Sequence, residues 1–538
     1  MKKAQIGLSI VILLVSAGLF AQQKIIPLDS PVYRDLETAA IRKGMAPPFD
    51  SRPWTVSEAL YYYQTLGMAP HPSIRQFALL ESDNLTINIS PEFSLEGYLK
   101  SNQQTDGNNY LVPWLYDYGD RLGVVNIESD VILGDGFYMG WEIDLLQENL
   151  ADQRSGNFSN LALDFGYYDV NFPFVAYGAA GGENWTALIG RSDLVLGPGY
   201  SGQLIVSDSP DWLDQLRFSL WHENFKYTGA LIYVQPYLDS SEVLVVGARM
   251  GDVFLDSKYL VFHRFDFTFF DIWNFAVSEG LSWGGRPLDL RMFNPFILMH
   301  NFYEWEYAAS LFSLDSELTF APGWQAYGQF MFNAITTPYE IRRYGADAEP
   351  PAMGWMAGIQ YALPRAEDDV DIRVGVEYVH TDPWLYIRET QLTSYSWRRR
   401  ALSNLIGAKP LITKPIGYEW GPDSNVYLLY ADGSLPLSIG PALDFEASLR
   451  YIEDGEQELT TPYSDWDGSS TASTPSGTPE RYFLLALAPS LGFELGRSHR
   501  LILGLNADLL YLQNAGHNEG NNQFDAQFAL GITWSSHR

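Results

Sequence analysis

The sequence predicts an all-β fold, a transmembrane antiparallel barrel of roughly 18 strands with a small helical segment before it. Three observations support this prediction. Phe, Tyr and Trp make up 15% of the 538 residues, which also include 46 glycines. After the first 21 residues, no apolar run reaches the roughly 20 residues that a membrane-spanning helix needs. From Leu85 onward, apolar and polar residues alternate with period two, which is the pattern of strands with one apolar face.

Residues 1–21 predict an export signal. Lys2 and Lys3 precede the apolar run from Ile6 to Phe20, and Ala21 closes it before two glutamines. A charged start, a short apolar stretch and a small residue at the end are typical of a cleaved secretory signal peptide. Together with the barrel pattern, this signal predicts a protein of the bacterial outer membrane, in contact with outer-membrane lipid.

The composition excludes several classes of function. The chain contains no cysteine, so it has no disulfide scaffold, no thiolate metal site and no cysteine nucleophile. Its formal net charge of −31 argues against a nucleic acid as partner, because nucleic-acid binding depends on positive charge. We expect no cofactor.

The segment 22–80 has the periodicity of helices. A first helix is expected after the Ser30-Pro31 start, and it breaks at Gly44. A second helix is expected after Thr55, with Glu58 three residues later, which is the spacing of a capping box. We therefore predict a small N-terminal helical segment at the periplasmic mouth of the barrel.

The barrel itself is predicted for residues 81–538. In KYLVFHRFDFTF, which begins at Lys258, the residues Val261, Phe265 and Phe267 share one face, while Arg264 and Asp266 share the other. The segments PALDFEASLRYI, LILGLNADLLY and QFDAQFALGITW alternate in the same way. Because an open sheet cannot satisfy its edge hydrogen bonds in lipid, these strands must close into a ring. The Phe faces then meet lipid, and the charged faces meet a polar lumen.

The length of the alternating segments separates this prediction from a soluble sandwich, whose strands also alternate. A strand that crosses a bilayer takes about 9–11 residues, whereas a soluble strand is typically about 5–6 residues long. Several segments keep their alternation over the longer distance. A secreted all-β enzyme is the alternative that shares most of the compositional features.

Connections of two kinds are expected between the strands. The longest, at about 381–423 and 453–480, are rich in charged residues, Gly and Pro, and are predicted to be extracellular loops. Short breaks at 269–271 and 321–323 are predicted to be periplasmic turns. The chain ends four residues after Trp534, so an aromatic residue near the end of the last strand suits recognition by the outer-membrane insertion machinery.

No catalytic signature is present. The eight histidines are scattered without metal-binding spacing, and neither a G-x-S-x-G motif nor a P-loop occurs. We predict that the protein is not an enzyme and has no metal site.

Charged residues on the expected inward faces form a predicted lumen polar network. They could bind a polar or charged glycan, or they could pair with one another and rigidify a wide barrel. The second interpretation is favoured, because an unpaired charge in a lumen is costly. The network comprises Arg217, Glu223, Arg264, Asp266, Arg286, Arg373 and Glu377.

Aromatic residues in the predicted loops are candidates for sugar binding, since most other Trp residues are expected in the interfacial girdles of the barrel. A run of three arginines follows one of them and forms a local cationic cluster in an acidic chain. This cluster could bind an acidic polysaccharide or lipid phosphates, or it could pair with neighbouring acidic loops. The candidate ligand-binding residues are Trp384, Trp397, Arg398, Arg399, Arg400 and Trp420, with Trp466 as a further loop aromatic.

Three blocks of the sequence resemble a known family. They are the helical start IPLDSPVYRDLETAAIRKGMAPPFDSRPWTVSEAL and the blocks Ile189 to Thr228 and Lys258 to Phe296, which contain Gly197-Pro198-Gly199 and Asn294-Pro295. These blocks look like the capsule assembly Wzi family. The resemblance implies an 18-stranded outer-membrane barrel whose periplasmic mouth is closed by an N-terminal helical bundle. It also implies a surface lectin that holds exported polysaccharide on the cell.

Two functions follow as hypotheses. The first is a non-enzymatic, lectin-like barrel that binds or anchors exported capsular polysaccharide or exopolysaccharide through its external loops, where many weak contacts along a polymer would give avidity. The alternative is an outer-membrane porin or substrate-selective diffusion channel, whose acidic lumen would favour cations.

Overall fold

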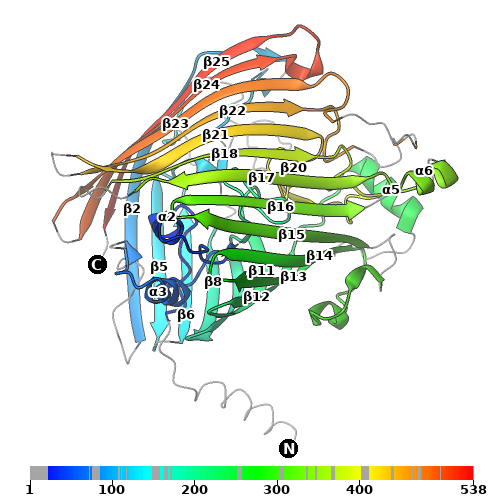
Figure 1. Cartoon of the computed structure of the whole chain (residues 1–538). Coiled ribbons are helices and arrows are strands. Elements are labelled where there is room, and N and C mark those ends of the chain that lie inside the picture. The colour runs from blue at the N-terminus through cyan, green and yellow to red at the C-terminus, as the bar shows by residue number, and fades with distance from the viewer. Residues whose placement is uncertain are drawn as a thin grey trace, which may run out of the picture.

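The computed structural model is a closed antiparallel β-barrel (Figure 1). The structure describes residues 22–71, 73–74, 85–106, 109–110, 112–116, 118–134, 136–147, 158–162, 168–169, 173–250, 257–301, 308–334, 337–345, 348–364, 370–400, 411–437, 441–461, 466, 468, 474–496 and 498–536. Eighteen barrel strands lie in this part of the chain, as the alternation predicts. They are β2 (Leu85–Lys100), β5 (Val125–Leu133), β6 (Phe137–Asp144), β8 (Ala176–Gly182), β9 (Trp185–Ser192), β11 (Leu213–His222), β12 (Phe225–Tyr233), β13 (Lys258–Phe269), β14 (Trp273–Gly284), β15 (Ala308–Ala321), β16 (Trp324–Ala334), β17 (Ala352–Ala362), β18 (Asp371–Thr381), β21 (Ser424–Pro436), β22 (Ala442–Asp454), β23 (Glu480–Glu494), β24 (His499–Gln513) and β25 (Gln523–Ser536).

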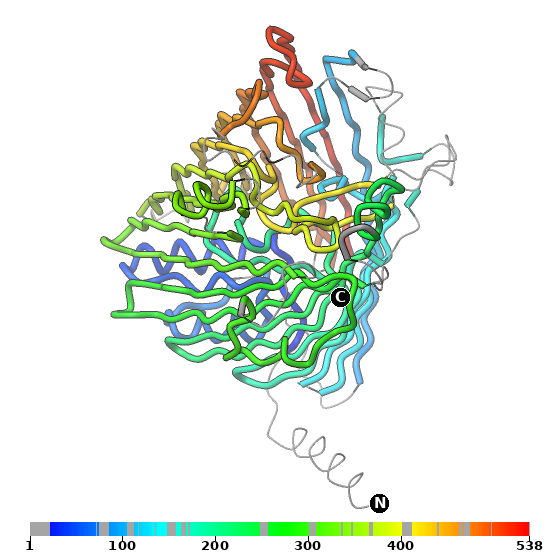
Figure 2. Tube along the Cα trace, turned by 90° about the vertical axis from the view of Figure 1, so that its right-hand side faces the viewer, coloured from blue at the N-terminus to red at the C-terminus, as the bar shows by residue number. Residues whose placement is uncertain are grey.

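The strands run up and down around the ring. Each pairs with its neighbours in the chain, and β25 pairs with β2 to close the barrel, with Trp534 opposite Phe93. Figure 2 shows this closure as the light-blue first strand beside the red last strand. Short connections such as 183–184 and 223–224 lie at one end of the barrel, which we call the turn end. Long connections such as 193–212 and 382–423 lie at the other, the loop end.

The two faces of the strands differ as the alternation predicts. In β13, Arg264 and Asp266 point into the barrel and are 2% and 3% exposed, whereas Phe265, Phe267 and Phe269 point outward. In β25, the outward Leu530 and Ile532 are 62% and 49% exposed. A wall that presents bulky apolar side chains to its surroundings and buries charge inside is the arrangement of a barrel in contact with lipid.

Two helices of the N-terminal segment lie inside the ring of strands near the turn end, drawn dark blue in Figure 1. Ser30 caps α2 (Pro31–Arg42) and Thr55 caps α3 (Val56–Thr65), as the sequence indicates. The capping box of α3 forms only in part. Thr55 accepts a hydrogen bond from the Glu58 N–H, but the Glu58 carboxylate pairs instead with Lys226 of β12.

The remaining elements are short. No helix among the described residues combines the length and the apolar composition that a membrane crossing requires. The other helices of the described residues are α5 (Ser240–Met250), α6 (Pro338–Tyr344) and the 3₁₀ turns η1 (Tyr118–Asp120), η4 (Leu290–Phe293), η5 (Met299–Asn301) and η8 (Ala515–His517). The short strands in the same part of the chain are β1 (Ser51–Arg52), β3 (Thr105–Asp106), β4 (Asn109–Tyr110), β7 (Phe158–Ser159), β10 (Val195–Leu196), β19 (Ser396–Arg400) and β20 (Leu411–Pro415).

Inside the barrel, the two charged residues of β13 belong to a buried triad of ion-paired side chains. Arg264 donates through Nε to Asp266, 2.8 Å away, and pairs through Nη1 with Asp315 of β15. Ser313 also donates to Asp315, at 2.7 Å. All these side chains are nearly inaccessible to water. A buried charge is tolerated when it is paired and hydrogen-bonded in this way.

Removing the arginine of this triad should destabilise the barrel strongly. Arg264→Met leaves two buried carboxylates without their cation, which should cost about 3–5 kcal/mol. Unfolding in urea in detergent micelles, followed by heat-modifiable gel migration, measures the loss. The control is Arg481→Met, because its pair with Glu453 is 37% exposed at the arginine and such pairs contribute about 0–1 kcal/mol. Equal stability of the two variants would contradict this assignment.

A second charge cluster holds the N-terminal segment in the lumen. Glu37 of α2 pairs with Arg52 and with Arg373 of β18, the latter at 2.7 Å. Arg373 also reaches Asp432 of β21 at 2.9 Å. Burial by itself raises the pKa of the Glu37 carboxyl, but the guanidinium groups of Arg52 and Arg373 outweigh burial and hold this pKa below its ordinary value of 4.5.

Docking of α2 should therefore weaken in acid. The Glu37 pKa is lower when docked than when free, so its contribution is complete above about pH 4.5 and is lost as the pH falls through the docked pKa. Amide hydrogen exchange of residues 31–42, corrected for the intrinsic rate at each pH, should show faster opening in that window. Glu37→Gln should weaken docking at neutral pH and show less acid dependence. The same acid response in both proteins would rule out Glu37 as its source.

Candidate functional site

Two plugs enter the lumen from opposite ends and meet inside it. The N-terminal segment enters from the turn end and carries β1, while the connection 193–212 enters from the loop end and carries β10. The two strands pair antiparallel, with Ser51 opposite Leu196 and Arg52 opposite Val195. The N–H of Gly197 also donates to the Asp50 carbonyl at 3.2 Å. The bore is thus crossed by a small sheet built from both plugs.

The connection 193–212 is fastened to the barrel wall. Glu377 of β18 accepts hydrogen bonds from the N–H groups of Tyr200 and Ser201, at 2.7 and 3.1 Å. The ring of Tyr200 stacks on Tyr430 of β21 with centroids 3.6 Å apart. The side chain of Gln329 in β16 accepts a hydrogen bond from the Leu204 N–H at 2.6 Å and donates one to the Leu196 carbonyl at 3.1 Å. These contacts fix the position of the loop within the lumen.

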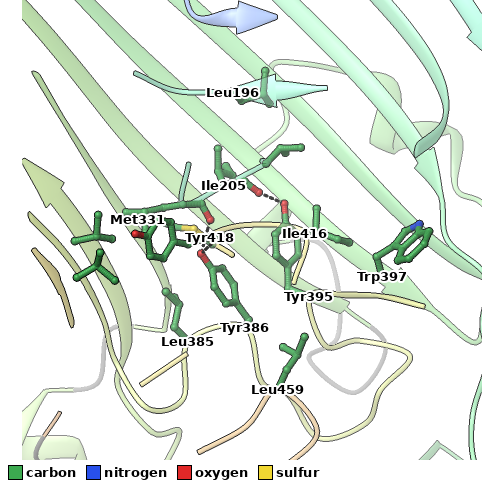
Figure 3. Packing of buried hydrophobic residues seen from close by; sticks show 14 of the residues in the cluster. Leu196, Ile205, Met331, Leu385, Tyr386, Tyr395, Trp397, Ile416, Tyr418 and Leu459 are labelled. Carbon is green, nitrogen blue, oxygen red and sulfur yellow. Dashed lines mark hydrogen bonds between the residues drawn. The ribbon is translucent and has the colours of Figure 1, made fainter. Parts of the chain in front are cut away.

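The described parts of the connection 382–423, residues 382–400 and 411–423, fold inward over this first loop and pack with it into a hydrophobic core (Figure 3). Tyr386 donates through its hydroxyl to the Leu204 carbonyl at 2.6 Å, and Tyr395 donates to the Ile205 carbonyl. Lys258 at the start of β13 donates to two carbonyls of the second loop, those of Gln391 and Ser396, at 2.9 and 2.8 Å. The loop-end plug is therefore a packed unit, held together by side-chain hydrogen bonds to its buried backbone carbonyls.

Most of the predicted ligand-binding residues lie inside this plug. Trp397, Arg398 and Arg399 stand on the inward hairpin β19–β20 and are 2–3% exposed. Arg398 forms a bidentate pair with Glu242 of α5, and Arg399 pairs with Asp211. Trp384 and Trp466 are buried together in a separate cluster. Two members of the predicted set reach solvent, namely Arg400, which is exposed, and Trp420, which is half-buried.

The residues of the predicted lumen polar network do not form one group in the structure; some are buried in the lumen and others lie in connections between strands. Arg264 pairs with Asp266, Arg373 with Glu37 and Asp432, and Glu377 binds the loop 193–212. Arg217 is buried on the lumen face of β11. Glu223 lies in the turn after β11, beside a cavity of about 200 Å³ under α3. Arg286 lies in the connection after β14.

The lumen is filled unevenly. Side chains that face inward from β11 to β17 are buried, as Lys226, Ser278 and Gln329 illustrate at 0–2% exposure. On the opposite wall, inward side chains in the turn-end halves of β22 to β24 are half-exposed or exposed, and the Asp444 carboxylate is 40% exposed. Nearer the loop end, inward residues of the same strands such as Ile452 and Leu510 are buried. The plugs therefore fill the lumen along β11 to β17 and leave water access along the turn-end half of the opposite wall. The accessible wall is acidic.

The half-buried Trp420 stands at the loop end of this accessible wall. Its ring packs on Tyr482 of β23 with centroids 5.0 Å apart, and its indole N–H donates to Glu419 at 3.1 Å. Arg450 of β22 donates to the same carboxylate at 3.3 Å, and Asp508 of β24 lies within electrostatic range of Arg450. A ring with carboxylates and a guanidinium beside it can stack on a sugar and hydrogen-bond its hydroxyl groups. This group is the candidate binding site.

The sequence indicated part of this site. Trp420 was a predicted loop aromatic, and Arg450 and Asp508 fall on faces that the alternation places inward. Glu419 was not singled out, because a glutamate next to a loop aromatic carries no periodic signal. The inward course of the connection 193–212 was also missed, although its glycines with positive φ, Gly197 and Gly202, are a sign of a tightly folded loop.

Comparisons with known proteins show the fold. No family model and no curated protein sequence matches the chain. Among solved structures, it is similar to Wzi of Escherichia coli, an outer membrane protein involved in group 1 capsule assembly and described as a carbohydrate-binding β-barrel. The TM-score is 0.56 and the identity 13%, over 95% of this chain and 98% of that one. It is also similar to the outer membrane protein OprD of Pseudomonas aeruginosa, with a TM-score of 0.41 and 10% identity, over 84% and 93% of the two chains.

A residue larger than glycine at position 197 should separate the two plugs. Gly197 has φ +136°, and an added Cβ would stand 2.5 Å from Nε2 of Gln329. Gly197→Ala should therefore cost about 1–3 kcal/mol in backbone strain and displace β10 from β1. Planar-bilayer recordings should show more frequent openings than wild type. Gly520→Ala is the control, since Gly520 has φ +81° but nothing within 4 Å of the added atom. Wild-type conductance in Gly197→Ala would contradict the role of this junction.

Proposed function

We propose that this protein is a non-enzymatic outer-membrane barrel that binds exported polysaccharide at the cell surface. The observation that carries the proposal is the meeting of the two plugs in the lumen. A barrel whose interior is occupied by a packed core and a sheet from both ends is suited to present a rigid surface, since its loops are held by buried contacts.

The surroundings of Trp420 support a sugar as the ligand. A half-buried indole ring has an apolar face for the C–H groups of a sugar, and Glu419 and Arg450 supply an acceptor and donors beside it. The neighbouring acidic wall disfavours a polyanion, so we infer a neutral or weakly charged polysaccharide. The carbohydrate-binding description of the structurally similar Wzi agrees with this class of ligand.

The orientation and export route belong to the same proposal. Residues 1–21, which lie outside the described residues, act as the cleaved signal. The segment 22–80 sits at the periplasmic mouth, the loops face the exterior, and the insertion machinery recognises the final strand with Trp534. This orientation follows the rule that short turns of such barrels are periplasmic.

Loss of the Trp420 ring should weaken polysaccharide binding. Trp420→Ala should raise the Kd for a bound oligosaccharide by about thirtyfold, corresponding to about 2 kcal/mol for a buried aromatic anchor. Glycan-array screening followed by calorimetry in detergent measures it. Trp420→Tyr should keep part of the stacking and recover part of the affinity, while Trp141→Ala on the outer wall should bind like wild type. Equal affinity in all variants would remove Trp420 from the site.

A channel is the second candidate function, and the accessible acidic wall of β22 to β24 favours it. Such a wall would admit water and cations along one side of the plugs. Stable cation-selective conductance of the wild-type protein, together with no glycan binding, would replace the first proposal with this one.

A further inference from the structure

The connection after β14 folds back over the outer wall of the barrel. We call residues 285–301 the outer clip; in Figure 1 its green coil lies outside the outline of the strands. Met292 and Met299 of the clip are fully buried and pack on outward-facing side chains of β13 to β15, including Val261, Leu281 and Trp283. The clip thus covers a surface that would otherwise meet lipid.

Two polar side chains lie beneath the clip. His263 of β13 and Glu279 of β14 both point outward and stand opposite each other in the strand register. His263 contacts the Met292 carbonyl through Nε2 at 2.7 Å and the Tyr227 hydroxyl through Nδ1 at 2.8 Å. Glu279 accepts a hydrogen bond from the Met299 N–H at 2.7 Å. The backbone of the clip therefore supplies partners for both groups.

This polar pair lies within the apolar band of the barrel. On the outward face of β14, Trp273 stands at the turn end and Trp283 at the loop end, which is how aromatic girdles are placed. Ten residues of a tilted strand span about 25 Å, which matches the height of the band. Glu279 lies between the two tryptophans, so without the clip it would meet hydrocarbon, where a charged group is costly.

The outer side of the clip is apolar and uncovered by the described residues. Phe296 and Leu290 are 85% and 81% exposed, and Leu298 and Phe293 are 61% and 41% exposed. The Phe296 ring lies 6.3 Å from that of Phe265, deeper along β13 than His263. The apolar side of the clip is therefore continuous with the lipid-facing wall.

The Arg and Asp residues of the clip, namely Arg286, Asp289 and Arg291, lie in its first part. Arg291 pairs with Asp289, and Arg291 remains 55% exposed at its side chain. A clip whose charges lie in its first part, and whose later part presents Phe293, Phe296 and Leu298 without a charged Arg or Asp, fits a boundary between headgroups and acyl chains. Its backbone is also partly self-satisfied, because the N–H groups of Met292, Asn294 and Ile297 bond to carbonyls within the clip.

We propose that the outer clip is a lipid-embedded element, whose outer side is occupied by acyl chains of the leaflet on the loop side. His263 and Glu279 anchor it to the wall, and the clip in turn shields them from hydrocarbon. The proposal rests on the membrane barrel and is independent of the ligand of the loops.

The absence of cysteine makes a direct test possible. Phe296→Cys carries a nitroxide label in proteoliposomes, and its collision rates with oxygen and with a water-soluble nickel chelate are compared. Leu449→Cys on the outward face of β22 is the lipid reference, and Glu519→Cys in the last loop is the water reference. The label at 296 should match the lipid reference. A match to the water reference would overturn the proposal.

Two further measurements separate the alternatives. Oxidation of Phe296→Cys in proteoliposomes should give monomers; an efficient disulfide-linked dimer would mean that a second copy, and not lipid, covers the clip. Glu279→Leu removes the acceptor of the Met299 N–H, so a label at position 298 should collide several-fold more often with the nickel chelate. Glu279→Gln keeps an acceptor and should leave that rate unchanged. Unchanged collisions in Glu279→Leu would overturn the anchoring role.

Discussion

The whole structure depends on the pairing of backbone N–H and C=O groups in a medium without water. A strand that meets hydrocarbon has no solvent to complete its hydrogen bonds, so the first strand must find the last. The β2–β25 pairing achieves this, with Phe93 beside Trp534. A closed barrel of eighteen strands is wide, so its interior must be filled either by protein side chains and loops or by water. The contents of the lumen are therefore a consequence of the closure.

The lumen shows both solutions. From β11 to β17 the inward side chains are buried, and several of their charges are paired, as in the Arg264, Asp266 and Asp315 triad. Along β22 to β24 the inward carboxylates stay in contact with water, where a charge needs no partner. This asymmetry gives the molecule a stiff side, to which the plugs and loops are fastened, and a hydrated side. Trp420 stands where the two meet at the loop end.

Periodicity was sufficient to predict the barrel, because the two faces of a strand follow from the backbone itself. Arg264 and Phe265 are adjacent residues, and alternation alone assigned them to lumen and lipid. The packing of the loops and the long-range ion pairs leave no periodic pattern in the sequence. The sequence around Trp397 is typical of a loop, yet its hairpin folds into the barrel and buries the side chain. Glu58 has the spacing of a capping residue, but Lys226, far away in the sequence, takes its carboxylate. Contacts between residues far apart in the sequence therefore determine the features that the sequence did not predict.

The junction of β1 with β10 also constrains the order in which the protein assembles. Ser51 belongs to the N-terminal part of the chain, but its partner Leu196 belongs to a loop whose position depends on β16 and β18. The β1–β10 pairing therefore requires that β16 and β18, which follow much later in the chain, hold this loop in place. The contact that closes the interior is thus made by the earliest described segment of the chain, yet it depends on strands that follow much later in the sequence.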